Sequence, residues 1–298
     1  MNGIVMMNKT DKATLVGSST ILMWSTLAFF TLKTGNIPPF QLVAMAFSIA
    51  FLLVLAKWLY YREPLSKYFS SSLSVWVVGV GGLFGYHFFY FMALKNAPAV
   101  EANLINYLWP VLIVLLSSFL PKEQLRWFHI VGAFLGVVGC FILVTQKGGL
   151  EFNTSYTVGY LAALACAVIW SVYSVLSRCL QHVATDTVGW FCLGTAILAG
   201  CCHTFFEVTV MPSGFMQWAA IIGLSIFPVG LAFFTWDYGM KWGDIKLLGV
   251  LSYAAPLLST LLLIIFTDSV ATWQLGIACI LIIGGALIAS KEHLSQAA

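Results

Sequence analysis

The sequence predicts an all-α membrane protein of ten transmembrane helices in two inverted five-helix repeats, and three observations support that prediction. The 298-residue chain is 60% hydrophobic and 8% charged. Soluble domains carry about 25% charged residues, so this composition cannot cover a globular surface in water. Apolar stretches of roughly 17–25 residues, the length that crosses a bilayer, recur along the chain. Its two halves also match each other in sequence.

Ten stretches have the length and apolarity of a membrane span. In chain order they cover residues 15–33, 40–60, 73–93, 98–120, 127–145, 158–178, 188–206, 216–238, 247–266 and 273–290. We expect each to be a helix, because a backbone in the hydrocarbon core must satisfy its own hydrogen bonds. The short alternating segments of a membrane β-barrel are absent from the sequence.

An internal repeat divides the ten spans into two sets of five. Shifted by 146 residues, the chain matches itself without gaps, and the paired residues are Trp24 with Trp170, Phe88 with Phe234, Lys95 with Lys241, Tyr107 with Tyr253, Pro110 with Pro256, and Trp127 with Trp273. We therefore expect a first repeat over residues 1–146, a linker over 147–157 and a second repeat over 158–298. Homologous halves of this kind are typical of secondary transporters, which bind their substrate between the two halves.

The basic residues predict the orientation of the spans. With the N-terminus inside, eleven Lys and Arg residues lie on the cytoplasmic side, and only Lys33, Lys95 and Lys147 lie outside. Cytoplasmic loops are enriched in these residues, so both termini are expected in the cytoplasm. Five spans per repeat is an odd number, and the second half therefore enters the membrane inverted. Inverted repeats are the arrangement that supports alternating access.

Polar and aromatic side chains within the spans indicate a candidate substrate site, because polar groups in hydrocarbon are costly and commonly functional. In the third span Tyr86 and Tyr90 share a helix face, with His87 beside them. Aromatic faces can stack on the apolar part of a small amphipathic solute, while hydroxyl, amide or imidazole groups hold its polar end. The expected substrate-binding residues are Tyr86, His87, Tyr90, Asn106, Tyr107, Trp109, Trp170 and Tyr253.

Each of these residue types has a structural alternative. Tyr and Trp at span ends form interfacial belts, and Asn and Ser bond between helices. The belt is the better interpretation for Trp58, Tyr60, Tyr61, Trp127 and Trp273. For His87 three roles are open: it binds the solute directly, it titrates and couples transport to protons, or it is a satisfied structural residue.

Two further pairs of residues are candidates for conformational roles. Pro110 and Pro256 lie in mid-span at matching repeat positions. Each removes a backbone hydrogen bond and permits a bend, so we expect hinges there. Asp237 and Lys241 are four residues apart near a span end, which suits an ion pair, and a gate or coupling role is the alternative.

Several classes of function are excluded by missing motifs. The sequence has no G-x-x-x-x-G-K-[ST], H-E-x-x-H or G-x-S-x-G motif, and no metal-ligand constellation. The seven cysteines lie in or beside apolar runs and are interpreted as small buried hydrophobes. A net charge of +3 is too small and too scattered for nucleic-acid binding. We expect no enzyme activity, no cofactor and no metal. The partners are then a small molecule and the lipid bilayer, and the oligomeric state is open, a monomer being compatible with the sequence.

The chain resembles the EamA-type drug/metabolite transporters over essentially its full length. The resemblance is most specific to the bacterial aromatic amino acid exporters, in three stretches: Lys12-Ala-Thr-Leu-Val-Gly with Trp24-Ser-Thr, Ile105-Asn-Tyr-Leu-Trp-Pro110, and Leu251-Ser-Tyr-Ala-Ala-Pro256-Leu-Leu-Ser. Trp236-Asp237-Tyr238 departs from that branch, which leaves the wall formed by the eighth span open.

The resemblance implies a multi-pass transporter of the bacterial inner membrane that exports aromatic or other bulky neutral amino acids. It also implies a central cavity lined by Tyr86, His87, Tyr90, Tyr107, Trp109 and Trp170, with fourth and ninth spans that swing at their prolines. Fold-level likeness specifies the transporter class better than the solute. Export of another metabolite or drug, such as a nucleoside or thiol compound, is therefore the alternative, and a passive channel or a structural membrane protein are more distant ones.

Overall fold

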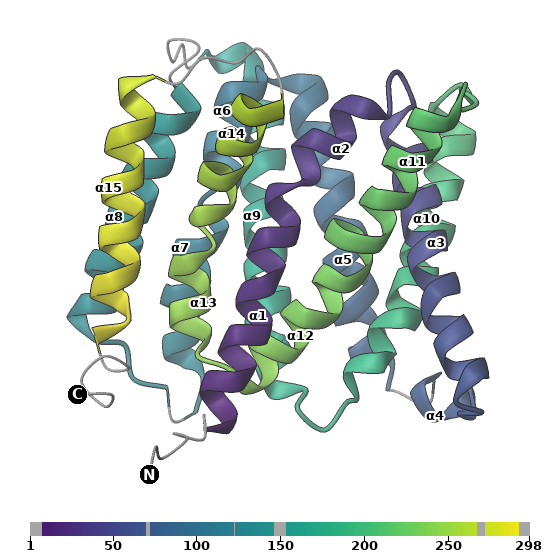
Figure 1. The fold of residues 1–298 in the computed structure, drawn as a ribbon, viewed down its shortest axis with the longest axis horizontal. Helices are drawn as coiled ribbons and strands as arrows, with labels where there is room; N and C mark the ends of the chain where they lie inside the picture. The colour runs from purple at the N-terminus through teal and green to yellow at the C-terminus, as the bar shows by residue number, and fades with distance from the viewer. Residues whose placement is uncertain (1–7, 70–71, 122, 146–152, 267–271, 292–298) are drawn as a thin grey trace.

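The computed structural model describes residues 8–69, 72–121, 123–145, 153–266 and 272–291. Every regular element within these ranges is helical (Figure 1). Of the linker expected at 147–157, residues 147–152 lie outside the described residues. The all-α prediction is confirmed.

The helices follow the ten expected spans closely. Among the described residues, nine segments are long and apolar enough to cross a membrane, and α15 is a shorter apolar helix of 17 residues. The helices are α1 (Lys9–Ser25), α2 (Leu27–Lys33), α3 (Pro39–Tyr60), α4 (Ser66–Phe69), α5 (Leu73–Asn96), α6 (Ala99–Asn106), α7 (Trp109–Leu116), α8 (Trp127–Thr145), α9 (Thr157–Cys179), α10 (Val188–Phe206), α11 (Phe215–Leu224), α12 (Ala232–Trp242), α13 (Ile245–Leu251), α14 (Ala254–Phe266) and α15 (Trp273–Ala289). Short turns of 3₁₀-helix occupy Ser117–Phe119, Thr154–Tyr156 and Thr185–Thr187, and a π-helical segment, η4, covers Ser225–Leu231.

Four of the spans are not single continuous α-helices. The fourth is divided between Asn106 and Trp109, and the ninth between Leu251 and Ala254. Shifted by 146 residues, the first of these breaks falls on the second, and each lies just before a proline, which cannot donate a backbone hydrogen bond. The first span bends at Thr26, and the eighth widens into η4 around Pro228.

The pairing of helices keeps its pattern when the two halves are exchanged. The α3–α10 and α8–α15 pairs each map onto themselves, and the α5–α9 pair maps onto α1–α12. The closest approaches involve small residues: a Cβ on Gly132 would overlap the carbonyl oxygen of Gly285, and one on Gly239 would meet the backbone of Gly17. Because each half packs mainly against the other, the two halves are interlocked rather than separate globular units.

The first described helix begins, and the last one ends, at the same face of the bundle. This face is called the terminal face, and it is the lower edge of Figure 1. The turns before α3 and before α11 lie at the opposite face, at the upper edge of the figure.

Candidate functional site

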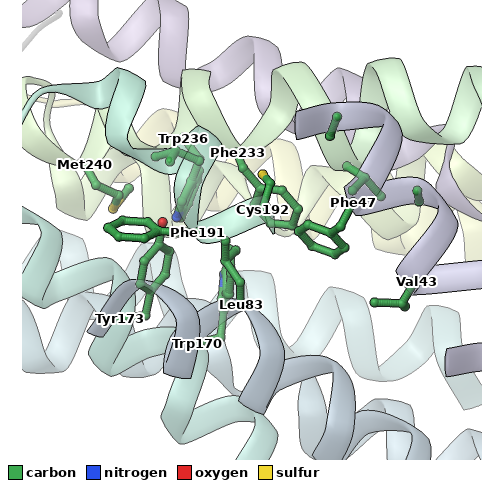
Figure 2. Close-up of a cluster of buried hydrophobic side chains, with 14 of the residues drawn as sticks. Val43, Phe47, Leu83, Trp170, Tyr173, Phe191, Cys192, Phe233, Trp236 and Met240 are labelled. Atoms are coloured by element: carbon green, nitrogen blue, oxygen red, sulfur yellow. The ribbon is translucent and has the colours of Figure 1, made fainter. Parts of the chain in front are cut away.

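Rings from six spans are in contact near Trp24 and form what is called the aromatic cluster: Trp24, Phe47, Tyr86, His87, Trp109, Trp170, Phe233 and Trp236. The ring centroid of Trp24 lies 5.9 Å from that of Trp109, 5.6 Å from that of Trp170 and 5.0 Å from that of Trp236. Most of these contacts are edge-to-face, the geometry that the aromatic quadrupole favours. Figure 2 shows Trp170 of α9, Phe233 of α12 and Phe47 of α3 converging between their helices.

The cluster lies near the middle of the spans because the chain breaks its helices there. Trp24 is next to the bend at Thr26, and its indole N–H donates to the carbonyl oxygen of Pro228 in η4 at 3.2 Å. Trp109 is the first residue of α7, directly after the break in the fourth span. Two chain breaks and the π-helical segment therefore meet at one place, which is where discontinuous helices put a transporter's binding site.

Accessibility differs sharply among the rings. Trp236, Trp170 and Trp109 are 0%, 4% and 6% exposed. Trp24 contacts all three of these rings, Tyr86 contacts Trp170, and His87 contacts Phe47. Each of the three keeps part of its surface accessible. The buried tryptophans thus form a wall, and the partly exposed rings are those that a solute could reach.

Hydrogen bonds of tyrosine, asparagine and histidine side chains lie on the α5 and α6 side of the cluster. The Asn106 amide donates to the Tyr86 hydroxyl at 3.1 Å, and the Tyr90 hydroxyl donates to Asn103 Oδ1 at 2.8 Å. His87 Nδ1 lies 2.7 Å from the carbonyl oxygen of Leu83, which only accepts hydrogen bonds. Nδ1 therefore carries a proton, and in the neutral form of the ring Nε2 is an acceptor.

Tyr107 and Tyr253, both expected in the site, lie in a neighbouring cluster instead. Tyr253 is fully buried with Cys140 and Leu257, and Tyr107 packs against the same group. The backbone N–H of Val111 donates to the Tyr253 hydroxyl at 3.1 Å. Among the described residues neither tyrosine makes a ring contact with the aromatic cluster. The structure thus brings together Tyr86, His87, Asn106, Trp109 and Trp170, with Tyr90 stacked on Tyr86 at 6.0 Å.

An ion-pair network joins several helix ends at the terminal face. Glu123, just before α8, binds Arg178 at the end of α9 at 2.7 Å and Lys246 of α13 at 2.5 Å. Burial alone would raise the pKa of Glu123, but its hydrogen bonds to the two basic side chains, and their charges, outweigh burial and lower that pKa. Arg178 also donates to the carbonyl oxygens of Met240 and Lys241, so the network reaches α12.

Asp237 and Lys241 form the expected i,i+4 ion pair, with 2.7 Å between Oδ2 and Nζ. Both residues are 3% exposed. Asp237 also accepts from the Thr185 hydroxyl at 2.7 Å, and Lys241 donates to the carbonyl oxygen of Val183 at 2.9 Å. A buried pair with its remaining hydrogen bonds satisfied favours a fixed structure, because the loss of either partner leaves an uncompensated charge.

Polar contacts hold the α3–α10 pair together at both faces of the bundle, and nothing in the sequence indicates these contacts. At the terminal face Lys57 binds Asp186 at 2.8 Å. At the opposite face the Glu207 carboxylate accepts from the backbone N–H groups of Phe40 and Gln41 at 2.9 and 3.0 Å, at the start of α3. A carboxylate at a helix N-terminus also interacts favourably with the helix dipole.

No metal site competes with the aromatic cluster as the candidate site: within the described ranges, no three His, Cys, Asp or Glu side chains are grouped to hold a metal ion. An apolar surface groove between α5 and α10 is lined by Trp76, Val80 and Ile197 among others. Ile197 is 57% exposed on the outside of the bundle, so the groove suits lipid chains rather than a polar solute.

Comparisons with known proteins agree with this architecture. The EamA-like transporter family model matches the chain twice, over residues 12–145 and 157–291. The aromatic amino acid exporter YddG of Ancylobacter novellus is 54% identical, over 94% of this chain and 97% of that protein. The exporter of the same name from Escherichia coli K12 is 23% identical, over 93% and 96%. A crystal structure of a protein 53% identical to this chain superposes with a TM-score of 0.90, over 94% of this chain and 98% of that one.

Proposed function

This chain belongs to the EamA-like transporter family, and we propose that it exports aromatic amino acids from the cytoplasm, binding them at the aromatic cluster. As a member of that family it is a multi-pass membrane transporter and not an enzyme. The observation that carries the substrate proposal is the contact of Trp24 with the three tryptophans of α7, α9 and α12. The exporter name of the 54% identical relative supports the same substrate class.

The chemistry of the cluster favours an aromatic side chain as the solute's apolar part. Indole and phenol rings prefer edge-to-face or offset contacts with centroids about 4.5–7 Å apart, each worth about 0.5–1.5 kcal/mol beyond the area buried. A solute ring beside Trp24 and Tyr86 would join contacts of this kind already present between Tyr86 and Trp170, whose centroids are 5.3 Å apart. An aliphatic solute would gain only the burial of its surface.

Alternating access would operate through the two inverted halves, residues 1–146 and 158–298. The separate family matches over 12–145 and 157–291 support this division, as does the exchange symmetry of the helix pairs. Breaks just before Pro110 and Pro256 give the fourth and ninth spans places to bend. The α3–α10 pair, fastened at both faces, would stay fixed while those spans move.

We assign the terminal face to the cytoplasm of a bacterium, with the protein in the inner membrane. The distribution of basic residues supports the assignment, since Lys9, Lys57, Lys67, Arg126 and Arg178 are at this face and cytoplasmic segments are enriched in such residues. The network around Glu123 would then hold the cytoplasmic side closed beneath the aromatic cluster.

Counterflow in proteoliposomes tests the proposal. Vesicles loaded with unlabelled tryptophan, phenylalanine or threonine are diluted into each labelled amino acid, and entry of label is followed. We expect saturable exchange of tryptophan and phenylalanine and much weaker exchange of threonine. Flux without saturation or counterflow would indicate a channel. Exchange of none of the three would contradict the aromatic substrate class and point to a different metabolite, such as the biotin carried by transporters of Escherichia coli that are 25% identical over 54% of this chain.

A further inference from the structure

We propose that Asn106 and Tyr86 form a binding site for the charged head of the substrate, which recognises an α-ammonium and an α-carboxylate together. This inference rests on the proposed function and makes it more specific. It assigns the aromatic cluster to the substrate's side chain and the adjoining amide and hydroxyl pair to its zwitterionic end.

The first observation is an unpaired oxygen. Asn106 is 4% exposed, and its Oδ1 has no hydrogen-bond partner among the described residues. Its Nδ2 is used, because it donates to the Tyr86 hydroxyl. A buried amide oxygen without a donor costs about 1–3 kcal/mol, so the native fold keeps a hydrogen-bond acceptor unpaired at this position. An ammonium group carries three donors and no acceptor, and it matches that need.

The second observation is an unused donor beside that acceptor. The Tyr86 oxygen accepts from Asn106, so its own O–H points elsewhere, and no acceptor for it occurs in the part of the chain that the structure describes. A carboxylate only accepts hydrogen bonds. One free acceptor and one free donor therefore lie on two adjacent side chains, whose amide nitrogen and hydroxyl oxygen are joined by a 3.1 Å hydrogen bond, so a single small head group can contact both.

The position of the pair connects the head to the side chain of the solute. Tyr86 contacts Trp170 through its ring and Asn106 through its hydroxyl. A ligand held at the hydroxyl thus extends naturally along the ring toward the tryptophans. Asn106 is also the last residue of α6, directly before the break in the fourth span. Bending of that span would move the acceptor relative to Tyr86, which offers a way to release the head group.

Neutral groups are suited to a zwitterion. A zwitterion has no net charge, so an amide and a phenol can hold it without leaving a fixed charge buried when the site is empty. Asp237 and Lys241, the buried charged groups of α12, already pair with each other. An amine without a carboxylate, or an acid without an ammonium, would leave one of the two protein groups unpaired.

The test compares three inhibitors of labelled tryptophan counterflow: tryptophan, tryptamine, which lacks the carboxylate, and indole-3-propionate, which lacks the ammonium. For the wild type we expect tryptophan to inhibit at roughly 10- to 100-fold lower concentration than either analogue, the range for hydrogen bonds to charged groups. Asn106→Leu should raise the concentration of tryptophan needed for inhibition and remove most of the difference between tryptophan and indole-3-propionate. Tyr86→Phe should reduce the difference in inhibitory concentration between tryptophan and tryptamine.

Asn103→Leu is the matched control. Asn103 is on the same helix, but its amide oxygen and nitrogen both have partners: it accepts from the Tyr90 hydroxyl at 2.8 Å and donates to the carbonyl oxygen of Ala99 at 2.8 Å. This variant should keep the wild-type order of inhibitors. Asn106→Leu with unchanged selectivity per folded molecule would overturn the proposal.

The wild-type comparison stands even where a variant does not fold. If tryptophan exchanges but the two analogues inhibit as well as tryptophan does, the head-group site is wrong while the proposed function holds. If tryptophan does not exchange at all, the proposed function itself has failed.

Discussion

Replacing Tyr253 by Phe should destabilise the protein through one hydrogen bond between its two halves. The N–H of Val111 lies in the first turn of α7, where backbone donors have no partner within their own helix. The Tyr253 hydroxyl supplies that partner from the other half, at 3.1 Å. The substitution removes the oxygen and keeps the ring on Gly136, so the cost is that of one unpaired buried donor, about 1–3 kcal/mol.

Thermal unfolding of the purified protein in detergent measures this cost. We expect the Tm of Tyr253→Phe to fall by a few degrees, while its half-saturation concentration for tryptophan stays near the wild-type value because the ring lies outside the aromatic cluster. Tyr107→Phe is the control, since Tyr107 occupies the equivalent repeat position and its hydroxyl makes no hydrogen bond within the described ranges. A wild-type Tm for Tyr253→Phe, or an equal fall for Tyr107→Phe, would refute the reasoning.

Two other predictions concern movement and pH. Pro110→Ala and Pro256→Ala should each restore a backbone donor near a break and stiffen the span. We therefore expect the exchange rate at saturating substrate to fall more than the half-saturation concentration changes. Wild-type rates in both variants would rule out the hinges. Glu123 has a pKa below its ordinary value of 4.5, so its stabilising effect is complete above that pH and is lost as the pH falls through the lower, folded-state pKa. The wild-type Tm should therefore decline more steeply below about pH 4.5 than that of Glu123→Gln, and parallel pH profiles would contradict the role of the network.

The spans could be predicted from the sequence because length and apolarity are local properties. The fifth expected span, 127–145, coincides with α8, and the breaks in the fourth and ninth spans fall beside their prolines. The bend at Thr26 had no comparable signal, since threonine is tolerated in helices. The π-helical turn does surround a mid-span proline, Pro228, but only Pro110 and Pro256, which match in the repeat, were predicted to interrupt their helices.

The candidate site could be predicted only in part. Tyr86, Asn106 and Trp109 were indicated by polar or aromatic character in mid-span, but Trp24, Phe47 and Trp236 were not assigned to the site. Which rings meet depends on the rotation of each helix, which a linear pattern does not specify. The repeat contained one usable signal: Trp24 and Trp170 are equivalent positions, and equivalent residues that touch must lie on the axis relating the two halves.

The most direct test of the aromatic cluster is tryptophan counterflow by Trp24→Ala beside Trp58→Ala. Trp24 is a partly exposed ring of the cluster. Trp58, expected in an interfacial belt, is instead fully buried near the terminal face, stacked on Tyr68 at 5.2 Å. We predict that Trp24→Ala raises the half-saturation concentration for tryptophan roughly 2- to 12-fold, which corresponds to the free energy of one aromatic contact. Trp58→Ala should lose about 3–5 kcal/mol of stability with half-saturation unchanged per folded molecule. Unchanged half-saturation in Trp24→Ala, or an equal rise in both variants, would contradict the placement of the substrate at the aromatic cluster.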